Sequence, residues 1–193
     1  MLVAIDHIIG RPVMGLQTGT RLAITMQAII DPRNLSIAAF YVEGPLVPAK
    51  PSVLHASDIR ELSDIGIIID SDAKLMPLDD LVRLKEIIDF QFELVGLKVV
   101  DDVGHKLGKI RGFSVDTLNF EVQQVYTEQS IFRSINSVGS TIARSQILSV
   151  DNQRMVVQSP KLAGKVKRPD ARVNLGAFVN PFRGSSQPES KDL

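Results

Sequence analysis

The chain has 193 residues, of which 44% are hydrophobic and 23% charged, a balance typical of globular proteins that bury a core. Lys and Arg together number 22, and so do Asp and Glu, so the overall charge does not point to nucleic acid or to a membrane surface. The absence of cysteine excludes disulfides, thiolate metal sites and thiol nucleophiles.

A secretion signal has a basic segment ahead of its apolar residues, and residues 1–12 have none. Uninterrupted apolar runs also fall far short of the ~20 residues that cross a bilayer. We therefore expect a soluble, cytoplasmic protein without a membrane span.

From residue 22 to residue 30 apolar side chains recur at every second position, which predicts a strand with one face in the core. A turn at Asp31 and a second apolar stretch over 35–42 predict a hairpin. Short strands are predicted again over 65–71 and 153–159.

Residues 77–90 separate the first group of strands from the second. Leu81, Leu84 and Ile88 recur at helical spacing, and Asp79 and Asp80 stand near the start, where a helix dipole favours acids. We predict a helix near 78–88 that connects the two groups and packs its apolar stripe on a barrel.

The sequence of the first hairpin reappears 85 residues later. The matched positions are those at which turns constrain the backbone. Gly19-Thr-Arg-Leu22 matches Gly104-His-Lys-Leu107, and Asp31, Asn34 and Tyr41 match Asp116, Asn119 and Tyr126. Shifts of 86 and 88 residues extend the match on either side. The chain therefore divides into a first repeat (1–76), a helical connector (77–92), a second repeat (93–159) and a basic, low-order tail (160–193).

Each repeat has the length of five or six short strands. A unit of this size has no spare segments to cover exposed sheet edges, so closure into a small β-barrel is the expected solution.

The motif Gly104-His-Lys-Leu-Gly-Lys-Ile110, followed by a strand and the turn at Asp116, resembles the PRC-barrel family. The first repeat is similar but has Ala23 and Ile24 in place of Gly-Lys. The resemblance spans 8–76 and 93–159, and it implies a mainly β protein with two SH3-like barrels in tandem. It also implies a binding or scaffolding role, because the family has no shared catalytic residues to transfer.

No motif in the sequence predicts chemistry. The three histidines, His7, His55 and His105, are scattered, and none has a second ligand at helical spacing. There is no nucleophile motif and no glycine-rich phosphate loop. We expect no catalytic residue, no cofactor and no metal, and nothing indicates a small-molecule ligand.

Two segments are candidates for binding. The loop 127–141 carries apolar residues that could form one contact surface, and the tail carries a cluster of bases typical of polyanion contacts. The candidate residues are Ile131, Phe132, Ile135, Lys165, Lys167, Arg168 and Arg172. The leading hypothesis is a non-enzymatic tandem-barrel adaptor that binds another protein. The alternative is an RNA- or ribosome-associated factor that uses the barrel loops and the basic tail.

Overall fold

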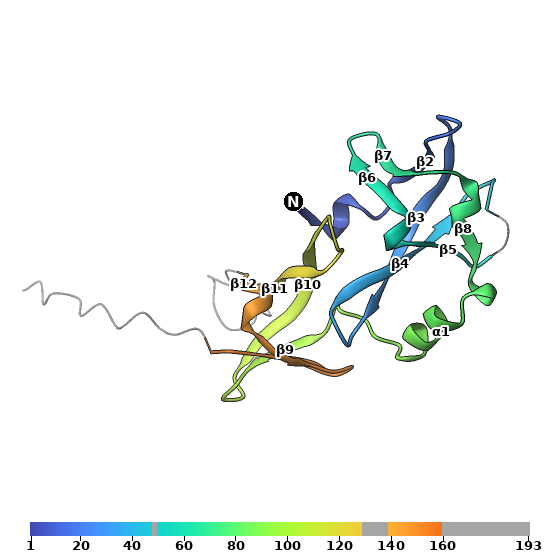
Figure 1. Cartoon of the computed structure of the whole chain (residues 1–193). Coiled ribbons are helices and arrows are strands. Elements are labelled where there is room, and N and C mark those ends of the chain that lie inside the picture. Colours follow the sequence, from blue (N-terminus) through green and yellow to red (C-terminus); the bar gives the residue numbers. More distant parts are fainter. Residues whose placement is uncertain (48–49, 129–138, 160–193) are drawn as a thin grey trace, which may run out of the picture. The chain divides into compact units, whose positions relative to one another are not determined.

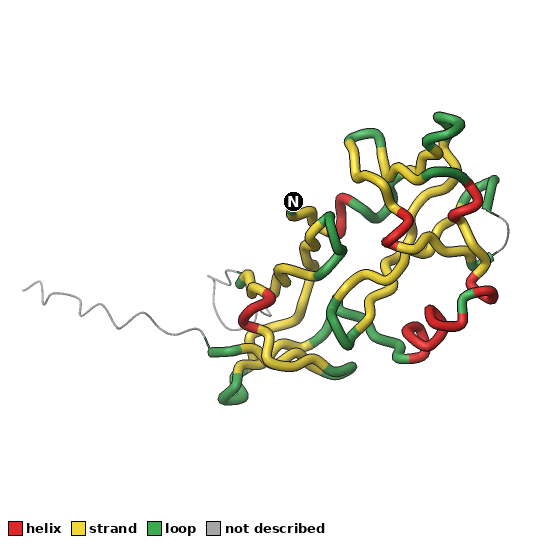
Figure 2. The backbone as a smooth tube through the Cα atoms, in the orientation of Figure 1, coloured by secondary structure: helices red, strands yellow, loops and turns green. Residues whose placement is uncertain are grey.

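The computed structural model describes residues 1–47, 50–128 and 139–159. Residues Met1–Ser159 form one compact unit. The described residues are mainly β and contain a single α-helix (Figures 1 and 2). No helix among them is both long and apolar enough to cross a membrane.

The first sheet has seven strands in the order β6-β7-β2-β3-β4-β5-β8 (Figure 1). Its pairs are antiparallel except for β2 and β7, which run parallel. The strands are β2 (Pro12–Gly15), β3 (Arg21–Asp31), β4 (Ser36–Glu43), β5 (Ser52–His55), β6 (Ile59–Ser63), β7 (Gly66–Ile69) and β8 (Leu75–Pro77).

The second sheet has the order β12-β11-β10-β9-β14-β13, and β1 pairs with β10 in addition. The strands are β1 (Leu2–Ala4), β9 (Lys98–Asp101), β10 (Lys106–Asp116), β11 (Val122–Glu128), β12 (Thr141–Ala143), β13 (Ile147–Val150) and β14 (Arg154–Val157). The helices are α1 (Val82–Asp89) and the short 3-10 turns η1 (Ile5–His7), η2 (Ala56–Asp58), η3 (Asp72–Lys74), η4 (Leu78–Asp80) and η5 (Arg144–Gln146).

The two sheets repeat the same register. Gln27 lies opposite Tyr41 in the first sheet, and 85 residues later Gly112 lies opposite Tyr126 in the second. The register irregularities recur as well, between Thr25 and Gln27 and at the matching place in β10. Shared bulges require the same local backbone path. The sequence repeat is therefore also a structural repeat.

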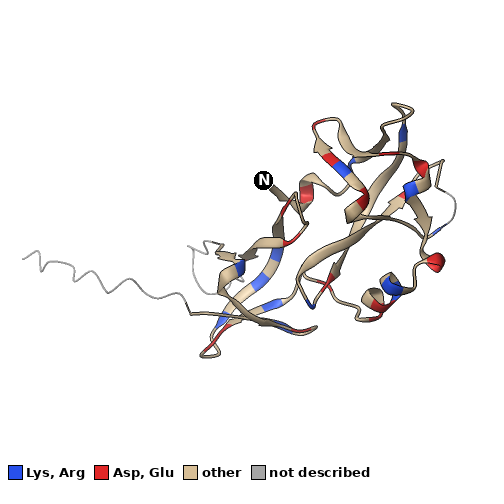
Figure 3. Ribbon diagram, viewed as in Figure 1, with Lys and Arg blue, Asp and Glu red and all other residues tan. Residues whose placement is uncertain are grey.

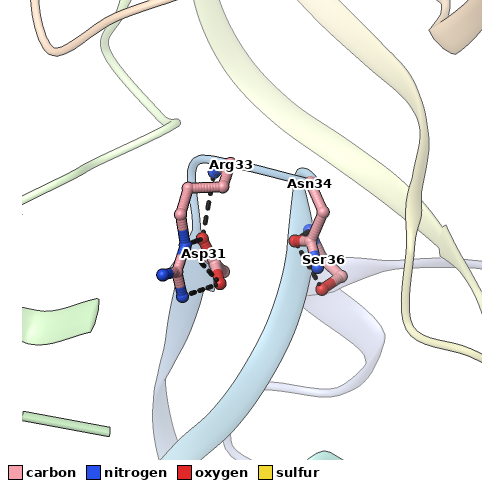
Figure 4. A network of polar contacts seen from close by, with 4 residues as sticks. All are labelled: Asp31, Arg33, Asn34 and Ser36. Atoms are coloured by element: carbon pink, nitrogen blue, oxygen red, sulfur yellow. Dashed lines mark hydrogen bonds and ion pairs between the residues drawn. The ribbon is translucent and has the colours of Figure 1, made fainter. Parts of the chain in front are cut away.

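Side chains fix the turn between β3 and β4 (Figure 4). The carboxylate of Asp31 accepts hydrogen bonds from the Arg33 backbone N–H at 3.0 Å and from the Arg33 guanidinium at 2.6–3.1 Å. The side-chain oxygen of Asn34 accepts bonds from the backbone and hydroxyl of Ser36 at 3.1 and 2.8 Å. Asp and Asn side chains commonly close turns in this way, by bonding backbone two residues on.

The two repeats are joined at these turns by a reciprocal contact. The N–H of Ile37 donates to the carbonyl of Phe120 at 2.9 Å, and the N–H of Val122 donates to the carbonyl of Leu35 at 2.8 Å. Each bond is the image of the other under the 85-residue shift. Leu35 and Phe120 both have positive φ, 51° and 56°. Such mutual pairing of equivalent groups is the pattern of a twofold interface between two identical subunits.

One hydrophobic core spans both sheets. Phe40 of β4 is fully buried, and its ring meets the ring of Phe120 edge to face with centroids 6.0 Å apart. The same core contains Ile67 of the first sheet and Val99 and Met155 of the second. The repeats therefore pack as parts of a single unit, Met1–Ser159.

The mainly β fold expected from the sequence is confirmed, and so is the helix, which begins at Val82 after the 3-10 turn Leu78–Asp80. Closed barrels are not observed. Within the described residues the outer strands of the first sheet, β6 and β8, are not hydrogen-bonded to each other, and neither are β12 and β13 of the second. The predicted alternation along β3 fails around the bulge, where Thr25 is fully buried and Met26 is exposed, whereas Ala28 and Ile30 beyond it pack against the main core as predicted.

Acid should destabilise the fold through its aspartates. The guanidinium of Arg33 lowers the pKa of Asp31, and burial opposes this effect without reversing it. The folded-state pKa therefore lies below the unfolded value of ~3.9, so the contribution to stability is present above that pH and is lost as the pH falls further. We expect the urea midpoint to fall between pH 6 and pH 3, and to fall less in Asp31→Asn. Asp6→Asn, which alters an exposed carboxyl without an ion pair among the described residues, should follow the parent.

Candidate functional site

Helix α1 covers the outer face of the first sheet. Leu84 is buried against Ile29, Ala39 and Val53, which point away from the main core, and these four residues form a second, smaller core. The sequence produces this arrangement because the outward positions of β3, β4 and β5 are apolar here, as is the facing stripe of the helix. Both faces of the first sheet are therefore covered at this point.

A groove of about 480 Å³ lies where the end of α1 meets β3. Such a volume falls within the range of ligand-binding clefts. One wall is β3 with Tyr41 of β4, and the other is the end of α1 with the residues that follow it. The lining residues are Gln27, Ala28, Ile29, Ile30, Tyr41, Ile87, Ile88, Gln91, Phe92 and Glu93.

The groove lies along an open edge of β3. Strand β2 pairs with β3 only from Arg21 to Ile24, and the last backbone bonds on this side join Thr25 to Gly10 and Arg11. Beyond Thr25 no described strand pairs with this edge of β3. An unpaired edge presents N–H and C=O groups that can pair with another strand.

The equivalent edge in the second repeat is filled. Strand β1 pairs antiparallel with β10, and Val3 lies opposite Val115. The 85-residue shift relates Val115 to Ile30, which lines the groove. The molecule thus shows the same edge twice, once with a strand on it and once without.

The second repeat also shows which backbone groups face the added strand. The N–H of Asp116 donates toward β11, to Glu121 at 2.9 Å, whereas the N–H of Thr117 donates to the carbonyl of Met1 at 2.9 Å. Because these directions alternate along a strand, the N–H groups of Ala28 and Ile30 face the groove. Pro32 stands at the position of Thr117 and has no N–H to donate. A strand on β3 would therefore bond at Ala28 and Ile30.

Polar side chains stand along the apolar walls. Burial raises the pKa of Tyr41, so its phenol stays protonated and can donate a hydrogen bond. Gln27 and Gln91 add amide groups on opposite sides of the groove. Among the described residues, none of these three side chains has a hydrogen-bond partner within the chain. An apolar groove with a few polar groups is typical of binding sites.

The binding residues predicted from the sequence fall in 129–138 and 160–193, outside the described residues, so the structure does not test those predictions. The groove and the open edge were not predicted. One sequence pattern points toward them, the Leu84 stripe with its predicted packing on the barrel. Strand β1 could not be predicted, because its three residues are too few to show a period.

No group of three or more His, Cys, Asp or Glu side chains in the described part of the chain is placed to hold a metal ion. His105 instead fixes the turn between β9 and β10, with Nδ1 2.9 Å from Oδ2 of Asp101 and its backbone N–H 2.7 Å from Oδ1. Burial raises the pKa of Asp101, and the bonds from His105 more than offset this effect. This histidine has a structural partner.

No protein-family model matches the chain, and no curated protein matches it either. The groove must therefore be interpreted from its own geometry.

Proposed function

We propose that the protein is a non-enzymatic adaptor that binds an extended segment of a partner protein along the open edge of β3. The observation that carries this proposal is the pair of equivalent edges, one occupied by β1 and one facing a groove. Strand addition to a sheet edge is a common way of recognising peptides, in which main-chain bonds give affinity and side-chain pockets give specificity.

The chemistry of the segment follows from β1. Val3 is half-buried between its neighbours, and in the groove a residue at its position would lie opposite Ile30 and on the face of the sheet where Ile30 packs into the main core. We therefore expect an antiparallel segment with an apolar β-branched or branched residue at its centre. Its flanking residues face Gln27 and Gln91, which suit polar groups.

The family and location are part of the same proposal. The glycine motif at 104–110 supports a tandem PRC-barrel protein, and the repeated strand order is compatible with two barrels of one type. Binding without catalysis is the role that this resemblance implies, with the cytoplasm as the proposed location.

A peptide with the sequence of residues 1–9 is a suitable first probe, because the chain itself seats residues 2–4 on the equivalent edge. We expect it to shift the amide NMR signals of Ala28 and Ile30. Ala28→Pro removes one N–H that faces the groove and should weaken binding about tenfold, since a backbone hydrogen bond contributes about 0.5–1.5 kcal/mol and the proline ring adds a clash.

Ala28→Ser is the matched control, because it keeps the N–H and should bind within about twofold of the parent. Both variants should keep the amide spectrum of β4, whose bonds leave β3 on the opposite side. Shifts confined to β10, or equal affinity of the proline and serine variants, would show that the peptide does not use this edge.

A further inference from the structure

Four basic residues lie on one face of the second sheet, across β10, β9 and β14. Lys109 is directly opposite Lys98, and Lys98 is directly opposite Arg154, so one row crosses three strands. Lys106 lies opposite Val100 in the next row of the same face. Directly paired residues share a face of a sheet, and Val99 between the rows is fully buried on the other side. We call Lys98, Lys106, Lys109 and Arg154 the basic face; Figure 3 shows basic residues along these strands.

The basic face lacks internal compensation. Among the described residues Lys98, Lys106 and Lys109 form no ion pair, and Arg154 has only Asp151, at 4.0 Å. Glu128 is opposite Lys109 on β11 but makes no ion pair with it. Like charges placed directly opposite each other on neighbouring strands destabilise a sheet. The row from Lys109 to Arg154 is therefore unfavourable for folding alone.

The first repeat shows that the fold does not require the three cations of this row, although Arg21 stands at the position equivalent to Lys106. The positions equivalent to Lys98, Lys109 and Arg154 are Pro12, Ile24 and Gly66, in the same register. Gly66 is packed so closely that a Cβ there would lie 2.3 Å from the carbonyl of Pro12. The same backbone thus carries an uncharged row in one repeat and three cations in the other. Because the row of cations destabilises the fold and is not required by it, we interpret these side chains as binding a ligand.

The neighbours of the cations indicate its class. Val100 and Val156, both half-buried, complete the rows, Ser149 lies beside them on β13, and Glu128 and the half-buried Tyr126 follow on the same face of β11. Protein interfaces are enriched in aromatic residues and depleted in lysine, which makes an acidic protein a poor match. A base-stacking surface would also need several exposed rings, whereas Tyr126 is half-buried and its hydroxyl donates to Oε1 of Gln124 at 3.4 Å. Cations placed side by side on neighbouring strands instead suit phosphates, whose contacts need no base recognition.

We propose that the basic face binds the phosphate backbone of a nucleic acid duplex, without reading its sequence. This site is separate from the groove at β3, so it adds a second partner to the adaptor. With four phosphates neutralised, the logarithm of the binding constant should fall against the logarithm of salt concentration with a slope of about −3.6, in addition to any contribution of the tail.

The test uses the full chain and a fluorescent 20-base-pair RNA duplex, titrated at several salt concentrations by anisotropy. Replacing Lys98 and Lys109 by glutamine should reduce the magnitude of the slope by about 1.8 and weaken binding at least tenfold at low salt. The control replaces Arg21 and Arg83 by glutamine, which changes the net charge equally but away from the basic face. Bases in the tail remain in both variants.

Three results would overturn the proposal. They are no binding of the duplex by the parent, equal slopes for the two double variants, and displacement of the duplex by poly-glutamate at equal charge concentration, which would point to an acidic protein. Circular dichroism of both variants should match the parent, since the first repeat folds with uncharged residues at these places. Failure here leaves the peptide test at β3 unaffected, because the two sites share no residue.

Discussion

Replacing Phe40 by alanine should lower the free energy of unfolding by about 3–5 kcal/mol. The side chain is fully buried and contacts Phe120 of the other repeat edge to face, so the substitution removes apolar contacts and opens a cavity at the joint. Urea unfolding followed by circular dichroism would measure the loss. Small domains are stable by only about 5–15 kcal/mol, so the variant should be close to unfolding at 37 °C.

The same variant tests whether the repeats share one core. Hydrogen exchange should quicken in β9 and β14 as well as in β4, because Val99 and Met155 belong to the same cluster as Phe40. Met26→Ala changes an exposed side chain on the neighbouring strand and should cost less than about 0.5 kcal/mol. Normal protection of β9 and β14 in the destabilised variant would show that the second repeat is stable independently of the first.

Arg144→Ala should cost about 2 kcal/mol, the second largest effect that we expect. From η5 the guanidinium of Arg144 reaches three backbone carbonyls at the joint: Asn34 at 2.6 Å, Val122 at 3.1 Å and Leu35 at 3.4 Å. Two of these carbonyls belong to the first repeat and one to the second. Hydrogen bonds to charged groups contribute about 1.5–3 kcal/mol. The loss removes the guanidinium donor from all three carbonyls, and Leu35 keeps the N–H of Val122 as a donor.

Arg144→Lys serves as the matched variant. It keeps the charge but not the planar fork, so it can satisfy only part of the set and should lie between the parent and Arg144→Ala. The thermal midpoint of each variant gives the order. If lysine restored the parent midpoint in full, charge alone would explain the effect. If alanine were neutral, the guanidinium would contribute nothing to the joint.

Much of the fold could be predicted from the sequence because local patterns determine it. The turns at Asp31 and Asp116 could be predicted because Asp side chains accept hydrogen bonds from the backbone two residues on. The 85-residue shift of the sequence repeat also relates the strand registers of the two sheets. The bulge at Met26 could not be predicted. It depends on how β3 twists between two partners, and nothing in the composition of 22–30 marks it.

The candidate sites depend on long-range pairing, which a sequence pattern does not contain. The basic face exists because Lys98, Lys109 and Arg154 are paired on neighbouring strands. They are far apart in the sequence and belong to no motif there. The groove exists because β3 lacks the partner that β10 has. Both could be recognised only by comparing two repeats whose backbones agree and whose neighbours differ.

The pairing of β1 with β10 also has a consequence for synthesis on the ribosome. Leu2 lies opposite Asp116, so this strand leaves the ribosome more than a hundred residues before its partner. At about 5–20 residues per second the delay is on the order of 6–20 s. During that interval the equivalent edge already made is that of β3, which residues 2–4 could occupy and then leave. The first repeat would thereby protect its own early strand until the second repeat is complete.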